Sequence, residues 1–312
     1  MFSALTPNAT YFLAGIFGLL IIASGVVLLL KRAHPDKDYT ELAARVNSWW
    51  IMAGVFAAAM ALSRTLSLAF LGFVSFLALK EYLSLIPTRR ADRRVLFWAY
   101  LAIPVQFYWV AIGWYGMFII FIPVYLFLLL PLRMVLIGET AGFLRAAGSL
   151  QWGLMLTVFN LSHMAFLLAL PEGRNPAGGG AGLVLFLMFL TQFNDVAQYV
   201  WGKTLGRHKI IPKVSPKKTW EGFLGGVATT TFMAWLLAPL LTPLTGWEGP
   251  AAGLLIGLAG FVGDVNISAL KRDLGIKDSG SLIPGHGGVL DRLDSLTFTA
   301  PLFFHFLYYL HY

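Results

Sequence analysis

The sequence contains no cysteine and few charged residues. The lack of cysteine excludes a disulfide framework, a cysteine-ligated zinc site and a thiol nucleophile. Asp, Glu, Lys and Arg make up only 12% of the chain, which is roughly half the fraction found in soluble domains. Because 58% of the residues are hydrophobic and the mean hydropathy is +0.72, the composition excludes soluble and disordered chains and indicates a membrane protein.

Several catalytic motifs are also missing. The chain has no HExxH zinc motif, no GxxxxGK[ST] phosphate loop and no Ser-His-Asp arrangement. Zinc proteolysis, P-loop hydrolysis and acyl transfer by a serine nucleophile therefore have no support in the sequence. The net charge of +8 is compatible with nucleic acid, anionic lipid or a phosphorylated substrate, so the positions of the charges must decide.

Long apolar runs recur along the chain. A helix needs about 20 mostly apolar residues to cross a hydrocarbon core of roughly 30 Å. The second run is short and the fourth contains Pro104, so the count is ten or nine. We predict an all-α, polytopic integral membrane protein with spans at Tyr11–Leu30, Ser48–Ser63, Leu66–Ile86, Val95–Ile112, Trp114–Leu132, Leu150–Leu170, Gly182–Gly202, Gly222–Pro243, Ala251–Leu270 and Leu293–Leu310.

The basic residues support ten spans. With this segmentation, 21 of the 23 Lys and Arg residues fall in alternate connecting loops. Short cytoplasmic loops hold most Lys and Arg in membrane proteins, so these loops are predicted to be cytoplasmic and both termini non-cytoplasmic. We expect a multi-pass protein of the cell (inner) membrane. Because topology explains much of the positive charge, nucleic acid is not needed as a partner.

Two aspartates lie inside predicted spans. Charges in spans are costly and usually functional. Counted along each helix, Asp195 lies roughly 12 Å and Asp264 roughly 10 Å from the basic residues that mark the cytoplasmic edge. Each carboxylate could simply pair with a Lys or Arg of a neighbouring helix. Their shared depth favours a common functional site that faces the cytoplasm.

Two basic cytoplasmic loops follow these spans. Loop 203–221 holds six basic residues and one acid, and loop 271–292 is 22 residues long, which is uncommon in a compact protein. In the second loop, glycines precede the predicted last span, whose N-terminus favours an anion. Asp291 and Asp294 share a helix face there and suggest Mg2+ bound together with phosphates. The simpler interpretation is that these acids only stabilise the helix N-terminus.

One stretch closely resembles a known signature. It reads Ser268-x2-Lys271-Arg272-x4-Lys277-Asp278-x5-Pro284-Gly285-His286-Gly287-Gly288-x2-Asp291-Arg292-x-Asp294-Ser295. This pattern resembles the signature of the phosphatidate cytidylyltransferase family, also called CDP-diacylglycerol synthases. The stretch from Ser215 to Gly222 and the Asn194-Asp195 pair are similar to that family as well.

The resemblance implies transfer of CMP from CTP to phosphatidate for phospholipid biosynthesis, with Mg2+ and, as a weaker expectation, a monovalent cation such as K+. It implies Asp264 and Asp291 as leading metal ligands, with Asp195 and Asp294 for a second cation or in support. The residues expected in catalysis are Asp264, Asp291, Lys271, Arg272 and Asp294. Those expected to bind substrate are Ser215, Lys217, Lys218, Ser268, Lys277, His286, Arg292 and Ser295.

We therefore divide the chain into a lipid-facing scaffold, 1–149, and a catalytic part, 150–312. The expected partners are CTP, phosphatidate and membrane lipids, and a homodimer is left open. One competing hypothesis is a transporter of an anion or phospholipid, which would typically show paired repeats and broken helices at the midplane. No internal repeat is evident. The other is a related enzyme that uses CTP on a different lipid phosphate.

Overall fold

The computed structural model describes residues 5–282 and 287–312, and in these ranges it contains helices and no strand. An antiparallel bridge joins Lys209 to Thr219, but it does not extend into a ladder. The predicted all-α class is therefore confirmed.

The first half of the chain forms six helical passages. Three are single helices, one is preceded by a short 3-10 turn, and two are interrupted by π-helical turns. In chain order they are α1 (Pro7–Ala33), α2 (Thr40–Leu62), α3 (Arg64–Leu85), η1 (Arg90–Asp92) with α4 (Arg93–Ala111), α5 (Tyr115–Ile120) with η2 (Phe121–Leu126) and α6 (Phe127–Val135), and α7 (Phe143–Leu154) with η3 (Met155–Phe159) and α8 (Asn160–Leu167).

The second half forms four more passages after the short turn η4 (Glu172–Arg174). They are α9 (Gly179–Thr204), α10 (Trp220–Leu241), α11 (Glu248–Asp273) and α12 (Leu290–Leu293) followed by α13 (Leu296–His311). Within the described ranges, seven passages are long and apolar enough to cross a membrane, namely α1, α3, α4, α5 to α6, α9, α10 and α11. The three other predicted spans are also helical, so the polytopic helical architecture is confirmed.

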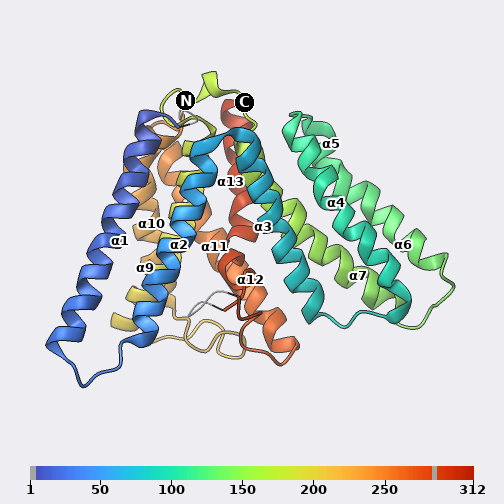
Figure 1. Ribbon diagram of the computed structural model, residues 1–312, viewed down its shortest axis with the longest axis horizontal. Helices are drawn as coiled ribbons and strands as arrows, with labels where there is room; N and C mark the ends of the chain where they lie inside the picture. Colours follow the sequence, from blue (N-terminus) through green and yellow to red (C-terminus); the bar gives the residue numbers. More distant parts are fainter. Residues whose placement is uncertain (1–4, 283–286) are drawn as a thin grey trace.

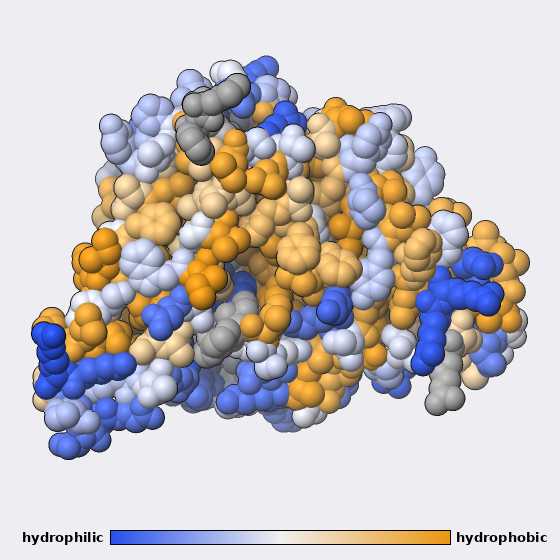
Figure 2. Space-filling model, in the orientation of Figure 1, coloured by the Kyte–Doolittle hydropathy of each residue, from blue (hydrophilic) through white to orange (hydrophobic). Residues whose placement is uncertain are grey.

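The elements are arranged so that the chain crosses the molecule back and forth. Figure 1 shows the start of α1 and the end of α13 at its upper end, and the loops after α9 and α11 at its lower end. An even number of passages places both ends of a chain on one side, as the ten-span prediction requires. Figure 2 shows hydrophobic side chains across the middle of this face and hydrophilic side chains along its lower edge. This is the pattern expected of a protein that sits in a bilayer.

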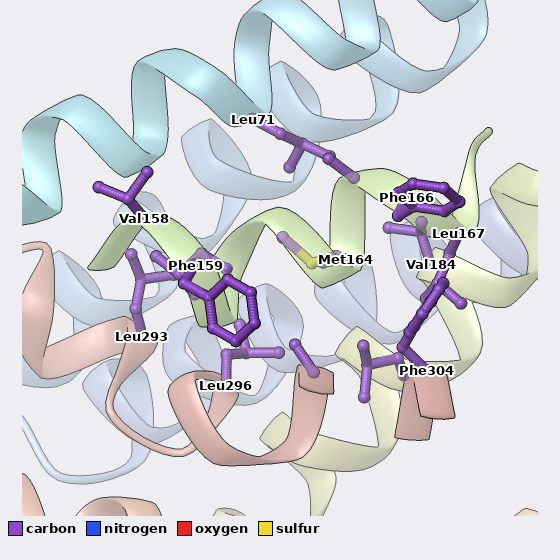
Figure 3. Packing of buried hydrophobic residues seen from close by; sticks show 14 of the residues in the cluster. Leu71, Val158, Phe159, Met164, Phe166, Leu167, Val184, Leu293, Leu296 and Phe304 are labelled. Atoms are coloured by element: carbon purple, nitrogen blue, oxygen red, sulfur yellow. The ribbon is translucent and has the colours of Figure 1, made fainter. Parts of the chain in front are cut away.

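The core lies where α8 passes between α3 and α13. Figure 3 shows Met164 and Leu167 of α8 with Leu71 of α3 on one side and Phe304 of α13 on the other. All four side chains are buried. One buried amide near this core is bonded across helices, since Gln106 of α4 donates to the Phe118 carbonyl at 3.1 Å.

Glycines allow the helices of the second half to pack backbone against backbone. A Cβ at Gly226 of α10 would lie 2.3 Å from Cγ of Gln198 on α9. A Cβ at Gly263 of α11 would lie 2.5 Å from the carbonyl oxygen of Asp294. Any side chain at these two positions would force the helices apart. The close contacts therefore hold the polar residues at the lower ends of α9, α11 and α12 near one another.

Candidate active site

The loop between α9 and α10 is held by backbone hydrogen bonds and by a helix cap. The N–H of Trp220 donates to the His208 carbonyl at 2.9 Å. The Thr219 hydroxyl accepts the N–H of Gly222 at 3.2 Å, which is a typical N-cap for α10. The carboxylate of Glu221 accepts the N–H of Arg207 at 3.0 Å. These bonds fold the basic loop back over the ends of α9 and α10.

A pocket of about 480 Å³ lies under this loop. It contains two carboxylates from different helices, Asp195 of α9 and Asp264 of α11, so the structure brings the two intramembrane aspartates together. Four lysines line the same pocket, namely Lys203, Lys209, Lys217 and Lys218. Ser215 also lines it. A cavity with several cations and two carboxylates suits a polyanion together with a divalent metal.

Lys218 connects the loop to both helices. Its ammonium forms an ion pair with the carboxylate of Asp264, and the two side chains are 16% and 24% exposed. The same nitrogen donates to Oε1 of Gln198 at 3.3 Å and lies 5.0 Å from the ring centre of Phe261. Because the pair is only partly exposed, its attraction is screened less than that of a surface pair.

Serine hydroxyls hold both aspartates. The Ser268 hydroxyl donates to Oδ1 of Asp264 at 3.1 Å. The Ser295 hydroxyl lies 3.1 Å and 3.2 Å from the two carboxylate oxygens of Asp195 and 3.1 Å from the Gly260 carbonyl, so its one proton is shared among acceptors. These two serines, which the sequence predicts to bind substrate, hold the carboxylates in place in this structure.

Asp294 lies between α12 and α13, beside the two pocket aspartates. Its Oδ1 accepts the N–H of Ser295 at 2.7 Å. The hydroxyl of the next residue, Ser295, bonds to Asp195. A Cβ at Gly263, the residue before Asp264, would lie 2.5 Å from the Asp294 carbonyl oxygen, so three aspartates gather here. Like charges this close need a cation nearby, and Lys218 supplies one by pairing with Asp264.

The carboxylates of this site can be compared with the ligands that a divalent metal prefers. In the part of the chain that the structure describes, no three His, Asp or Glu side chains form a ready cage for an ion. Mg2+ does not require such a cage, since it typically binds one or two carboxylates plus phosphate oxygens and water. Asp195 and Asp264, which line one pocket, thus fit a magnesium ion that arrives with phosphate oxygens, whereas Asp294 does not line this pocket.

Asp291 has a different set of partners. It is buried and forms an ion pair with Lys271 at 2.7 Å, and its other oxygen accepts the N–H groups of Ser279 at 2.8 Å and Gly288 at 3.0 Å. Burial alone would raise the pKa of Asp291, but the hydrogen bonds from Lys271 and from the two backbone N–H groups outweigh it and leave the pKa below its ordinary value. A charged Asp291 therefore joins the end of α11 at Lys271 to Ser279 and Gly288 of the following loop.

Glu81 is a functional candidate that the sequence analysis missed. It lies near the end of α3 and accepts the N–H groups of Val289 at 2.8 Å and Leu290 at 2.9 Å, as well as the Ser279 hydroxyl. A Cβ at Gly288 would lie 2.1 Å from its Oε1. The signal was present, because Glu81 is an acid at the end of a predicted span.

Arg272, Lys277 and Arg292, also predicted as site residues, do not line this pocket. Nε of Arg272 donates to the Val214 carbonyl at 3.2 Å and so ties the end of α11 to the first loop. Lys277 is exposed. Arg292 is half-buried, and its Nε has no hydrogen-bond partner among residues 5–282 and 287–312. His286, together with Ile283, Pro284 and Gly285, lies outside the described residues.

Comparison with known proteins points to one family. The family model described as "Cytidylyltransferase family" matches residues 43–310. The "Uncharacterized protein YnbB" of Escherichia coli (strain K12) is 46% identical over 297 residues, which are 95% of this chain and 97% of that protein.

Enzymes named phosphatidate cytidylyltransferase are similar over shorter stretches. That of Brucella suis biovar 1 (strain 1330) is 40% identical over 149 residues, which are 48% of this chain and 54% of the enzyme. That of Mycobacterium leprae (strain TN) is 44% identical over 117 residues, or 38% of each chain. The chain thus matches only about half of the Brucella enzyme and less of the mycobacterial one. Because the family match at 43–310 includes every element that lines the pocket, the chain belongs to the cytidylyltransferase family.

Proposed function

We propose that this protein transfers CMP from CTP to phosphatidate and releases CDP-diacylglycerol and pyrophosphate. Membership of the family supports a CTP-dependent transfer to a lipid phosphate. Phosphatidate is the lipid named for the Brucella and mycobacterial relatives. The observation that carries the proposal is the single pocket in which two aspartates and four lysines meet at the ends of membrane-spanning helices.

The reaction needs no protein nucleophile. A phosphate oxygen of the lipid attacks the α-phosphorus of CTP and forms a new P–O bond. The bond from the α-phosphorus to the oxygen that bridges to the β-phosphate breaks, and pyrophosphate leaves with that electron pair. Catalysis of such a transfer consists mainly of alignment and of neutralising charge. The four lysines of loop 203–221 that line the pocket would bind the triphosphate and the departing pyrophosphate.

The carboxylates have a separate task. Asp195 and Asp264 would hold Mg2+, with Asp294 beside them in support, and the bound ion would neutralise and orient the phosphates. Lys218, which pairs with Asp264 in this structure, would then be released to a phosphate oxygen. Asp291 is the other metal ligand expected from the family resemblance, but its oxygens are occupied by Lys271 and two N–H groups. We therefore propose that Asp291 stabilises the loop and does not bind the metal. A second, monovalent cation such as K+ stays a prediction.

We also propose the orientation of the protein. The two loops of the site hold ten of the 23 Lys and Arg residues, and they lie together at the end opposite both termini (Figure 1). The positive-inside rule places this end in the cytoplasm, where CTP is available, with the protein in the inner membrane of the cell.

A direct assay tests the function. Purified protein in lipid nanodiscs is given CTP, Mg2+ and phosphatidate, and pyrophosphate release is measured. We expect release only when all three are present, and its loss in Asp264→Asn. The matched control is Asp36→Asn, which changes an exposed aspartate in the loop between α1 and α2 and should keep full activity.

Two other outcomes would redirect the proposal. Turnover of CTP with another lipid phosphate but not with phosphatidate would make the protein a related enzyme of different specificity. Flux of a labelled anion across liposomes without any turnover of CTP would favour a transporter.

A further inference from the structure

A second cavity lies among the helices that are predicted to span the membrane. It has a volume of about 430 Å³ and is walled by α1, α2, α3, α8, α9 and α12. Its walls are apolar along most of their length, with Phe17, Met52, Phe56, Val74, Met164 and Met188 among the lining side chains. We call this cavity the apolar chamber. Its size falls within the range of cavities that bind small molecules.

The apolar chamber opens sideways. Ile51 and Val55 of α2 and Phe73 of α3 line it, yet they are 67%, 50% and 56% exposed, so these walls also face the surroundings. Figure 1 shows α2 and α3 diverging from their shared upper turn, with α12 between their lower parts. Ser63 produces that turn, because it ends α2 in extended conformation and caps α3 by accepting the N–H of Leu66 at 3.2 Å. A molecule dissolved in the bilayer can reach the chamber between these helices.

The lower end of the apolar chamber is polar. Gln192 of α9 and Arg292 of α12 line it there, and the amide of Gln192 donates to the Arg292 carbonyl at 3.3 Å. Arg292 is the one cation among the described lining residues, and its Nε is buried without a hydrogen-bond partner among them. The carboxylate of Asp195 is within electrostatic reach of Arg292, but no described carboxylate forms an ion pair with this guanidinium. A guanidinium beside apolar walls is costly unless an anion pairs with it. The chamber therefore matches a long apolar group with an anionic head.

The same end adjoins the proposed active site. Gln192 precedes Asp195 by three positions on α9, so the two share a helix face. Arg292 precedes Ser295 by three positions, and the Ser295 hydroxyl bonds to Asp195. An anion bound to Arg292 would thus lie beside the carboxylates that we assign to the metal.

We propose that the apolar chamber binds an acyl chain of the lipid phosphate, whose phosphate pairs with Arg292. The proposal rests on the function proposed above and assigns the part of the chain before residue 150 a role in substrate selection. One wall of this chamber, α1, lies outside the residues 43–310 that the family model matches.

The chamber should act on selectivity more than on affinity. Lipid tails are about as apolar as leucine side chains, so moving a chain from the bilayer into an apolar cavity yields little hydrophobic gain. What the cavity adds is a limit on length and shape. A bulky side chain in its wall should therefore exclude a long chain and tolerate a short one.

The test compares two phosphatidates in one preparation. Ala53 lines the chamber midway along α2, and Ala53→Trp fills part of it. We expect the ratio of kcat/KM for dipalmitoyl over dioctanoyl phosphatidate to fall by about tenfold or more in this variant. The control is Ala58→Trp, an exposed position on the same helix that does not line the chamber, which should leave the ratio unchanged.

Taking a ratio removes the effect of partial unfolding, and Ala53→Leu supplies a milder variant if Ala53→Trp does not fold. An unchanged ratio of kcat/KM in the Ala53 variant, which includes an equal loss of activity with both lipids, overturns the proposal that the chamber binds the acyl chain. Failure of the wild-type protein to use either phosphatidate overturns the proposed function instead, so the two failures can be told apart.

Discussion

The carboxylate of Glu81 accepts the backbone N–H of Leu290 at 2.9 Å, although 209 positions separate the two residues in the chain. It also accepts the N–H of Val289 at 2.8 Å, so it caps the start of α12. Since Asp291 follows directly, a residue of α3 holds in place the segment that carries the Asp291–Lys271 ion pair. The first half of the chain therefore contributes, through Glu81, to the position of residues at the candidate site.

Removing this cap should slow the transfer. In Glu81→Ala, the N–H groups of Val289 and Leu290 lose their acceptor, and the segment from Ser279 to Asp291 becomes free to shift. We expect kcat to fall on the order of a hundredfold, because misplacement by about 1 Å has that effect on aligned reactants. The measurements are pyrophosphate release and amide hydrogen exchange of residues 279–282 and 287–291, which should become faster.

Two variants serve as controls for Glu81. Glu81→Gln keeps an acceptor oxygen without the charge and should recover part of the activity. Glu41→Ala changes an exposed glutamate of α2 that pairs only with Arg45 in the described structure, and it should behave as wild type. Normal exchange in the segment together with normal kcat in Glu81→Ala would show that the cap has no part in catalysis.

Lys218 should matter mainly for the nucleotide. Its ammonium lines the pocket and is held near Asp264, where a triphosphate would meet it. In Lys218→Gln we expect KM for CTP to rise about tenfold to a hundredfold, which corresponds to the loss of one hydrogen bond to a charged group. Lys213→Gln is the matched control, because Lys213 is exposed in the same loop but does not line the pocket. Equal effects in both variants would mean that only the overall charge of the loop counts.

The dependence on Mg2+ should distinguish the aspartates. A chelator should abolish pyrophosphate release, and added Mg2+ should restore it. In Asp195→Asn, the Mg2+ concentration for half-maximal rate should rise about tenfold or more. Asp291→Asn should lower the rate without that shift, since Asp291 is occupied by Lys271 and by backbone N–H groups. The reverse pattern would assign the metal to Asp291, as the family resemblance implies.

Much of this architecture could be predicted from the sequence because each span leaves a local signal. Twenty apolar residues and the alternation of basic loops do not depend on tertiary contacts, so all ten predicted spans correspond to helical segments. The approach of Asp195 to Asp264 could be predicted too, because helical rise fixes the depth of each residue. The depth of a residue does not determine its partners. Glu81 meets Leu290, and Asp291 meets Lys271, through packing of distant helices that no local pattern encodes.

Arg292 lies where the apolar chamber meets the proposed active site, so its loss should affect the lipid substrate more than the nucleotide. It lines the polar end of the chamber, while the lysines that line the nucleotide pocket belong to another loop. Arg292→Gln should therefore raise KM for phosphatidate by about tenfold or more and leave KM for CTP unchanged. Arg292→Lys should fall in between, because an ammonium keeps the charge but cannot bind a phosphate through two parallel N–H groups. Both values are measured in mixed micelles at varied lipid fraction, with Arg93→Gln, an exposed arginine of α4, as control. A rise in KM for CTP alone would place Arg292 on the nucleotide and leave the polar end of the chamber without its anion.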